Sequence, residues 1–257
     1  MAIHPTAVVD KQAKIGKDPQ IGPYCIIGPN VTIGDGAVLM SHVVVDGHTT
    51  IGAGCTIFPF ACLGTITQDL KFKGERTYVK IGARTTIREY VTVNGATGDE
   101  TETVVGENCH IMAYAHIAHN CVVGNQVIIA NVGTLAGCVT IEDQAIIGGL
   151  SAVHQFCRVG RLAIVGGCSK VVQDIPPFMM ADGHPAVVRG LNTVGMQRKG
   201  IAEEAQKDLK QAFKILFKSG LNTSHALEQI RQEVRTGEEL NQFVRFVETS
   251  ERGISKK

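Results

Sequence analysis

The feature that most constrains this chain is a repeat of six residues. Every sixth position from Ile3 to Val171 is Ile, Leu or Val, except Asp69, Glu75 and Asp99. A period of six matches neither the 3.6-residue repeat of an α-helix nor the two-residue alternation of a long strand. Short strands that meet at a turn every six residues predict a three-sided coil of about 18 residues, stacked as a parallel β-helix.

A second regularity lies two residues before each repeat position, where the side chain is nearly always small. Alternate residues of a strand point to one side, so both positions should face the interior. Cysteine fills the small position at Cys25, Cys55, Cys109, Cys121 and Cys157. We interpret these cysteines as small buried apolar side chains rather than metal ligands or disulfide partners, which also suits a reducing cytosol.

Two polar segments interrupt the repeat, near residues 65–78 and 95–103. Neither can continue the coil, so both are predicted to protrude as loops, and long loops in compact domains are often functional. After Val171 the repeat gives way to a connection rich in Pro and Gly, and from about Gly200 the pattern becomes helical. The sequence therefore predicts a β-helical domain over residues 1–190 and a C-terminal helical domain over residues 191–257.

The first predicted C-terminal helix carries a stripe of lysines. These are Lys207, Lys210, Lys214 and Lys218. The stripe is interpreted either as a solvated face or as a dock for an acidic partner.

The overall charge excludes some classes of partner. Lys plus Arg number 25 against 24 for Asp plus Glu, so a net charge of +1 gives no general attraction to nucleic acid or anionic membranes. The chain contains no apolar run of membrane-spanning length, and its N-terminal residues do not resemble a secretory signal. We expect a cytoplasmic protein without an integral membrane segment and without a nucleic-acid partner.

Two histidines that the core does not explain are the first candidates for chemistry. His116 and His119 both fall outside the inward positions of the repeat. Residues 18 apart should stack in the uninterrupted stretch 105–171, which puts Gly137 and then Gln155 over His119. His154 lies beside the same column. An imidazole suits a general base at neutral pH, and a glycine N–H without a neighbouring Cβ suits an oxyanion.

The spacing of His116 and His119 is also compatible with zinc, with His110 or His154 as the nearest candidates for a third ligand. That interpretation predicts a metal enzyme resembling the γ-carbonic anhydrases. No third ligand stands out, so we expect no metal and no cofactor. An incidental pair of surface histidines, and a purely structural β-solenoid, are the remaining alternatives.

Several motifs together resemble one enzyme family. They are TQDLK, AHIAHNCVVGN, AIIGGLSAVHQFCRVG, VGGCSKVVQDIPP and GLNTVGMQRKG, in this order along nearly the whole chain. The set resembles the UDP-N-acetylglucosamine O-acyltransferases, the first enzymes of lipid A biosynthesis. The resemblance implies a left-handed β-helix and a homotrimer with active sites between subunits. It also implies transfer of an (R)-3-hydroxyacyl group from acyl carrier protein to the 3-hydroxyl of the UDP-sugar. A 3-amino acceptor, giving an amide, is the alternative acceptor.

The resemblance also implies roles for individual residues. By motif, His119 matches the general base and Gly137 the oxyanion donor, and Asn120 stands where some members have Asp. An amide oxygen there can still orient the imidazole. The predicted lining of the sugar and acyl site is His116, His154, Gln155, Gln68, Asp69 and Lys71.

The nucleotide end is the last part of the site that the motifs imply. Asn192 and Arg198 match it, because a guanidinium suits a diphosphate. Lys199 replaces a second Arg there, and Asn94 stands where a His of relatives can contact the nucleotide. Cys138 likewise replaces a His found in some members. Gly167 matches a position that limits acyl length, and Gly there predicts a groove open to a long chain.

Overall fold

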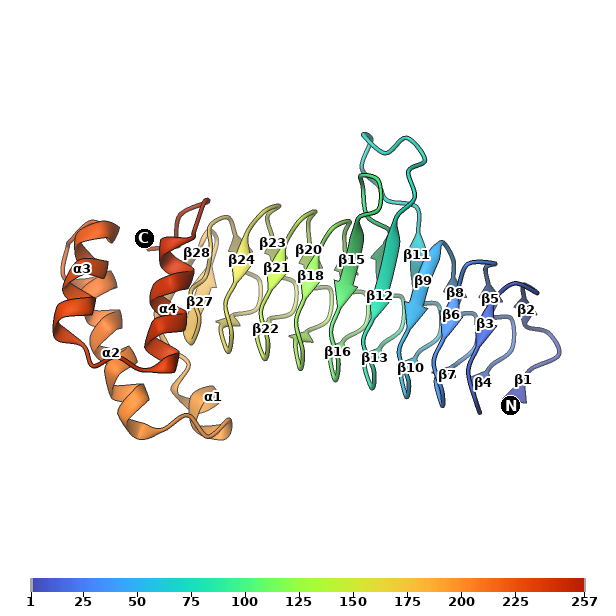
Figure 1. Ribbon diagram of the computed structural model, residues 1–257, viewed down its shortest axis with the longest axis horizontal. Helices are drawn as coiled ribbons and strands as arrows, with labels where there is room; N and C mark the ends of the chain where they lie inside the picture. Colours follow the sequence, from blue (N-terminus) through green and yellow to red (C-terminus); the bar gives the residue numbers. More distant parts are fainter. Residues whose placement is uncertain (1, 257) are drawn as a thin grey trace.

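The computed structural model describes residues 2–256. It shows a left-handed parallel β-helix that ends in a small group of helices, with the N-terminus at the far end of the coil (Figure 1). Each coil contributes one short strand to each of three sheets, as the six-residue repeat predicts.

Each sheet forms one side of the coil. The 11-stranded sheet contains β1 (Ala2–Ile3), β4 (Gln20–Ile21), β7 (Val38–Leu39), β10 (Thr56–Ile57), β13 (Thr86–Ile87), β16 (His110–Ile111), β19 (Ile128–Ile129), β22 (Ile146–Ile147), β25 (Ile164–Val165), β27 (Met179–Gly183) and β28 (Ala186–Leu191). The nine-stranded sheet contains β2 (Val8–Val9), β5 (Ile26–Ile27), β8 (Val44–Val45), β11 (Cys62–Thr65), β14 (Thr92–Asn94), β17 (His116–Ile117), β20 (Thr134–Leu135), β23 (Ala152–Val153) and β26 (Lys170–Val171). The eight-stranded sheet contains β3 (Lys14–Ile15), β6 (Thr32–Ile33), β9 (His48–Ile51), β12 (Tyr78–Ile81), β15 (Glu102–Val105), β18 (Val122–Val123), β21 (Thr140–Ile141) and β24 (Arg158–Val159).

The register explains why the repeat resumes in phase after each interruption. In a regular coil Ile111 pairs with Ile129, 18 residues on. Ile51 instead pairs with Ile81, and Ile81 with Val105, so these two coils are longer by 12 and by six residues. Both insertions are multiples of six, and the inward residues stay on one line. The two loops protrude together from one edge of the coil, between β11 and β12 and between β14 and β15 (Figure 1).

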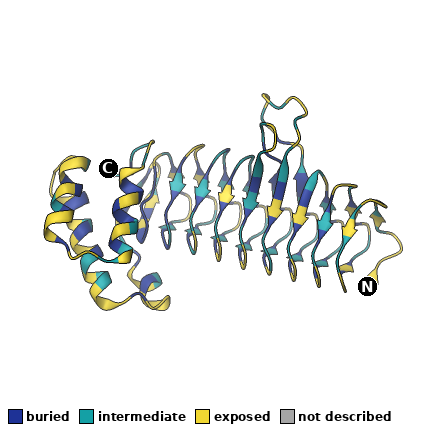
Figure 2. Ribbon diagram, in the orientation of Figure 1, coloured by how far each residue is buried: buried dark blue, intermediate teal, exposed yellow. Residues whose placement is uncertain are grey.

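The interior of the coil is filled by the repeat residues, and buried segments recur from coil to coil along the β-helix in Figure 2. All five cysteines at the small inward positions are buried, and all are free thiols, so the packing interpretation is confirmed. Burial raises the pKa of the Cys121 thiol to about 12, which keeps it protonated and unreactive. Ile3 remains 38% exposed because no coil covers it at the open end.

The C-terminal part closes the other end of the coil. β27 and β28 form an antiparallel pair, and four helices follow: α1 (Thr193–Arg198), α2 (Glu203–Lys218), α3 (Thr223–Glu233) and α4 (Glu238–Glu248). Arg158 anchors α4, because its guanidinium binds Asp174 and the Phe246 carbonyl and covers the Phe246 ring. The helical pattern from about Gly200 is confirmed, whereas the short helix α1 was not predicted. Within residues 2–256, no helix has the length and apolarity needed to cross a membrane.

Candidate active site

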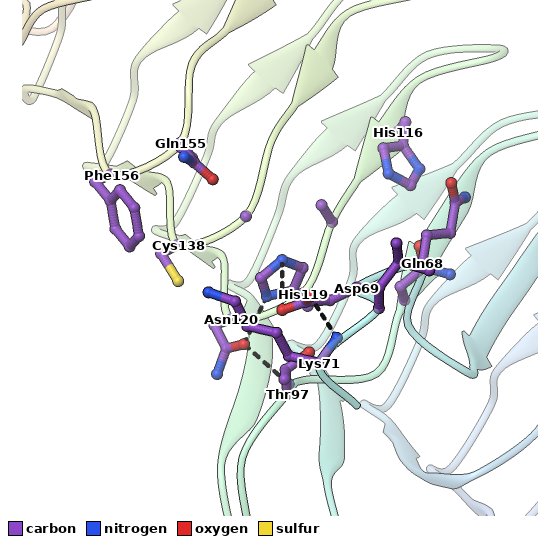
Figure 3. A pocket seen from close by; sticks show the side chains of 14 residues that line it. Gln68, Asp69, Lys71, Thr97, His116, His119, Asn120, Cys138, Gln155 and Phe156 are labelled. Carbon is purple, nitrogen blue, oxygen red and sulfur yellow. Dashed lines mark hydrogen bonds and ion pairs between the residues drawn. The ribbon is translucent and has the colours of Figure 1, made fainter. Parts of the chain in front are cut away.

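A cavity of about 640 Å³ lies between the first loop and the turns that follow β17, β20 and β23 on the outside of the coil (Figure 3). It contains most of the residues that the sequence singled out. Its lining consists of Gln68, Asp69, Leu70, Lys71, Asn94, Thr97, His116, Ala118, His119, Asn120, Gly137, Cys138, Gln155 and Phe156.

His119, Gly137 and Gln155 stack in successive coils, as their 18-residue spacing predicts. Cys138 N donates to His119 O at 3.0 Å, and Phe156 N donates to Gly137 O at 3.2 Å. The His119 ring lies directly over Gly137, because a Cβ built on that glycine would collide with Nε2 and Cε1 of the imidazole. Only glycine leaves room for the ring in this position.

The backbone N–H of Gly137 is available to a ligand. It donates to no acceptor among residues 2–256, while the neighbouring amides of Ala136 and Cys138 are both bonded to adjacent coils. The backbone N–H groups of His119 and Gln155, at the same turn position in the two adjacent coils, likewise donate to no acceptor among residues 2–256. What distinguishes Gly137 is that it has no side chain of its own beside this N–H. A bare donor next to an imidazole is a pairing that acyl transfer uses.

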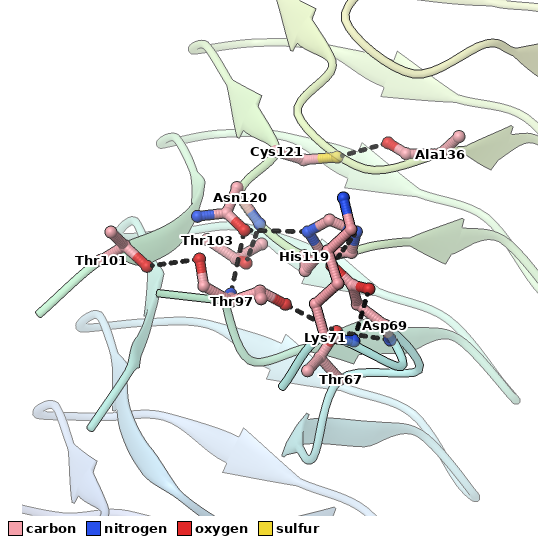
Figure 4. A network of polar contacts seen from close by, with 10 residues as sticks. All are labelled: Thr67, Asp69, Lys71, Thr97, Thr101, Thr103, His119, Asn120, Cys121 and Ala136. Carbon is pink, nitrogen blue, oxygen red and sulfur yellow. Dashed lines mark hydrogen bonds and ion pairs between the residues drawn. The ribbon is translucent and has the colours of Figure 1, made fainter. Parts of the chain in front are cut away.

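Asn120 sets the orientation of the His119 ring (Figure 4). Its Oδ1 lies 2.8 Å from His119 Nδ1 and also accepts a hydrogen bond from Thr97 N at 2.9 Å. Because the Thr97 amide can only donate, the atom between them is the amide oxygen. Nδ1 therefore carries the ring proton, and Nε2 presents its lone pair. Asn120 has φ 56°, a left-handed conformation that Asn tolerates better than most residues.

Asp69 faces the opposite side of the imidazole. Its Oδ2 lies 3.8 Å from His119 Nε2, and both side chains are about one-fifth exposed, at 20% and 21%. The other carboxylate oxygen accepts from Lys71 N at 3.0 Å, and Asp69 N donates to Thr67 Oγ1 at 3.1 Å. These bonds fix the loop so that a negative charge already stands where an imidazolium would form.

His116 has a different environment from His119. Its Nδ1 lies 2.7 Å from Thr92 Oγ1, and burial lowers its pKa because the charged form loses hydration. His116 is therefore a neutral polar group in the wall of the cavity at neutral pH. Within residues 2–256, no group of three or more His, Cys, Asp or Glu side chains is arranged so that it could hold a metal ion.

Five residues of the predicted site do not line this cavity. Asn192 is buried and caps α1, accepting from Gly195 N and donating to Leu162 O. Lys199 Nζ donates a hydrogen bond to Gln126 Oε1 at 2.8 Å. The remaining residues outside the cavity are His154, Gly167 and Arg198.

Sequence reasoning missed some of the lining. Thr97 and Phe156 were not singled out, although Phe156 follows Gln155 as Asn120 follows His119, with the same left-handed turn conformation. That 36-residue spacing is the signal that could have found Phe156. Thr97 lies in the second loop, where the six-residue repeat is interrupted and gives no information about position.

The β-helix with this site defines an acyltransferase of the hexapeptide-repeat class. Residues 12–47 and 102–133 match the model of bacterial transferase hexapeptide repeats, and residues 174–255 match the second domain of UDP-N-acetylglucosamine O-acyltransferase. A relative from Anaeromyxobacter sp. (strain Fw109-5) is 48% identical over 100% of both chains. Another, from Thermodesulfovibrio yellowstonii, is 50% identical over 99% of both. The chain therefore belongs to the UDP-N-acetylglucosamine O-acyltransferase family.

Both relatives are named acyl-(acyl-carrier-protein)–UDP-N-acetylglucosamine O-acyltransferase. A solved structure of a UDP-N-acetylglucosamine acyltransferase from Bacteroides fragilis is also similar, with a TM-score of 0.96 and 41% identity. The match covers 98% of this chain and 99% of that one. These names specify transfer to oxygen. They do not favour an amide-forming enzyme, a carbonic-anhydrase-like enzyme or a purely structural solenoid.

Proposed function

We propose that this protein transfers an (R)-3-hydroxyacyl group from acyl carrier protein to the 3-hydroxyl of UDP-N-acetylglucosamine, the first step of lipid A biosynthesis. The observation that carries the proposal is the His119 Nε2 lone pair beside the free Gly137 N–H in one cavity. The names of the full-length relatives supply the two substrates. Both substrates are cytoplasmic molecules, so we place the enzyme in the cytoplasm.

His119 acts as the general base in this mechanism. Nε2 removes the proton from the sugar 3-hydroxyl as the hydroxyl oxygen attacks the thioester carbonyl. The carbonyl oxygen becomes an oxyanion and accepts the hydrogen bond of Gly137 N–H. When the tetrahedral intermediate collapses, the C–S bond breaks, and the departing thiolate takes the proton back from the imidazolium. No other group needs to change its protonation state.

Asn120 and Asp69 support His119 in two different ways. Asn120 holds the ring in the tautomer that leaves Nε2 unprotonated. Asp69 stabilises the imidazolium that forms after proton transfer, because its carboxylate lies 3.8 Å from Nε2. The Asn120 amide beside Nδ1 carries no charge, so the negative charge that stabilises the imidazolium comes from the Asp69 carboxylate beside Nε2.

A homotrimer completes the site in this proposal. Arg198 and Lys199, which the family motifs associate with the diphosphate, belong to α1 or its cap and do not line the cavity of their own chain. A second copy packed against the β-helix brings its own Arg198 to the nucleotide end of the site. The proposal predicts one nucleotide-sugar site per chain.

A direct assay tests the function. The purified protein is incubated with a 3-hydroxyacyl carrier protein and UDP-N-acetylglucosamine, and the product is identified by mass spectrometry. We expect an ester at the 3-oxygen, formed by the wild type and at least about a thousandfold more slowly by His119→Ala. Absence of the ester with the wild type, across donors of several chain lengths, would contradict the proposal.

A further inference from the structure

The second loop, residues 95–103, reaches the proposed base through Asn120. Thr97 in this loop donates its backbone N–H to Asn120 Oδ1 at 2.9 Å, and the same oxygen lies 2.8 Å from His119 Nδ1 (Figure 4). Within residues 2–256, the Asn120 side chain makes no other hydrogen bond. The orientation of this amide therefore depends on one backbone group of the second loop.

The orientation of the Asn120 amide decides whether His119 can act as a base. The two ends of a carboxamide have almost the same shape, but one accepts hydrogen bonds and the other donates them. When the oxygen faces Nδ1, the imidazole carries its proton on Nδ1 and keeps a lone pair on Nε2. When the Nδ2 group faces Nδ1 instead, Nδ1 must accept, the ring proton lies on Nε2, and Nε2 cannot take a proton from a substrate.

The other groups at the imidazole do not enforce the productive tautomer. The ring itself binds either end of the Asn120 amide, because a nitrogen of a neutral imidazole can donate or accept. The Asp69 carboxylate favours the opposite tautomer, since it lies 3.8 Å from Nε2 and attracts a proton to that nitrogen. The Thr97 N–H can only donate, so it excludes the Nδ2 end of the amide.

The fold holds Thr97 in place without the side chains of the active site. Thr101 Oγ1 donates to the carbonyl of Gly98 at 2.6 Å and to that of Thr97 at 3.1 Å, which closes the loop on itself. Tyr78 N donates to Thr101 O at 2.9 Å and joins the loop to strand β12. Ala96, directly before Thr97, is fully buried. The direction of the Thr97 N–H is therefore set by the coil and the loop.

We propose that Thr97 is a positioning residue for the acyl transfer, whose N–H holds the Asn120 oxygen against Nδ1 and thereby selects the tautomer of His119 that can accept a proton. The inference rests on the proposed function, in which Nε2 is the base. It depends on the identity of residue 120, because a carboxylate has an acceptor at both ends and needs no group to orient it. The role of Thr97 should therefore become dispensable in Asn120→Asp.

Thr97→Pro tests this role, because proline has no backbone N–H. Alone, it should lower kcat about tenfold and leave the KM of both substrates within about twofold, since Thr97 orients the base and binds no substrate. Combined with Asn120→Asp, it should lower kcat by no more than about twofold relative to Asn120→Asp alone. Thr97→Val is the matched control. It keeps the N–H and removes only the hydroxyl, which donates to Thr67 Oγ1 at 3.4 Å, so it should lose less than about threefold in kcat.

The ring nitrogens of His119 give a second test, which needs no turnover. Nitrogen NMR of protein with isotope-labelled histidine distinguishes a protonated ring nitrogen from a bare one, and the His119 signals are those that disappear in His119→Ala. The wild type should show a protonated Nδ1 and a bare Nε2. Thr97→Pro should show a second population with the proton on Nε2, and Asn120→Asp should remove that population from the double variant.

A further variant replaces Thr97→Pro if that protein does not fold. Thr101→Val removes the hydroxyl that closes the loop on Thr97. It should lower kcat about threefold in the presence of Asn120 and should have no measurable effect in Asn120→Asp.

Three results would overturn the proposal. The first is a folded Thr97→Pro protein with the kcat of the wild type. The second is a loss of the same size with Asn120 and in Asn120→Asp, because the loop would then act by a route other than the orientation of the amide. The third is a wild-type His119 that carries its proton on Nε2. Wild-type turnover is measured first. Its absence would contradict the proposed function, while the ring-nitrogen measurement would still test the role of Thr97.

Discussion

The imidazole of His119 occupies the space that a Cβ atom on Gly137 would need. One geometric fact thus places the proposed base and the proposed oxyanion donor in contact, and the coil spacing of the β-helix maintains it. Gly137 does not have a positive φ, so its backbone would accept another residue without strain. The requirement for glycine at this position comes from the imidazole, which makes it a requirement of the site and not of the fold.

Gly137→Ala should therefore damage activity more than stability. The added methyl group displaces the imidazole from its bonds to Asn120 and crowds the oxyanion position, so we expect kcat to fall at least about a hundredfold. Gly190→Ala is the matched control, because a Cβ there meets nothing within 4 Å. Steady-state kinetics and thermal melting of both variants check this. Equal activities in the two variants would contradict the placement of the ring.

Asn120 gives a test that separates ring orientation from backbone conformation. Asn120→Gly suits the left-handed φ of 56° but removes Oδ1, so kcat should fall about a hundredfold with little loss of stability. Asn120→Asp keeps an acceptor for His119 Nδ1 and Thr97 N, and should retain activity within about threefold of the wild type. If Asn120→Gly were as active as the wild type, the orienting role of the amide oxygen would be wrong.

The part of the site that the repeat governs was predictable, and the rest was not. His119, Gly137 and Gln155 stack as expected because each regular coil contains 18 residues, so position along the chain fixes position on the wall. Asp69 lies outside this pattern. Its loop lengthens the coil by 12 residues, and only contacts made after folding bring its carboxylate to His119. The handedness of the coil also came from the family resemblance, since a six-residue period is the same in either hand.

Asn192 shows a different limit of prediction. Its family motif associates it with the nucleotide, but in this chain both ends of its amide are bonded, to Gly195 N and to Leu162 O. The residues Asn192 to Gly195 have the spacing of a helix N-cap, which could have predicted α1. Whether Asn192 also contacts the nucleotide stays a prediction, and its structural bonds are sufficient to explain an Asn there.

Asp69→Asn tests the proposed stabilisation of the imidazolium. The amide keeps the shape of the carboxylate but removes its charge, so we expect kcat to fall roughly tenfold, with a smaller effect at high salt. Asp99→Asn, in the exposed second loop, is the control for loss of one negative charge. The measurement is kcat at two ionic strengths. A kcat that is unchanged in Asp69→Asn would remove Asp69 from the mechanism.

His116 predicts a dependence of stability on pH. Burial lowers its pKa from the ordinary value of 6.5, so below pH 6.5 the unfolded chain binds a proton at this side chain that the folded chain still excludes. The stabilising contribution of the neutral ring is complete above pH 6.5, and it is lost as the pH falls through the lower folded value. The melting temperature of the wild type should therefore fall further than that of His116→Gln when the pH is lowered below 6.5. Parallel curves for the two proteins would contradict this prediction.

Gly167 gives the test of acyl length. The family motif associates this position with the end of the acyl groove, and a Cβ there would meet only the Gly149 carbonyl, at 3.3 Å. The backbone therefore accepts a larger residue after a small shift, and the side chain must extend outward from the wall. Gly167→Met should shift the preference toward a shorter acyl donor by about tenfold or more in relative kcat/KM, since each buried methylene contributes about 0.8 kcal/mol. Donors of several chain lengths are compared in competition, with Gly190→Ala as control. An unchanged length preference in a folded Gly167→Met protein would show that the acyl chain ends elsewhere on the coil.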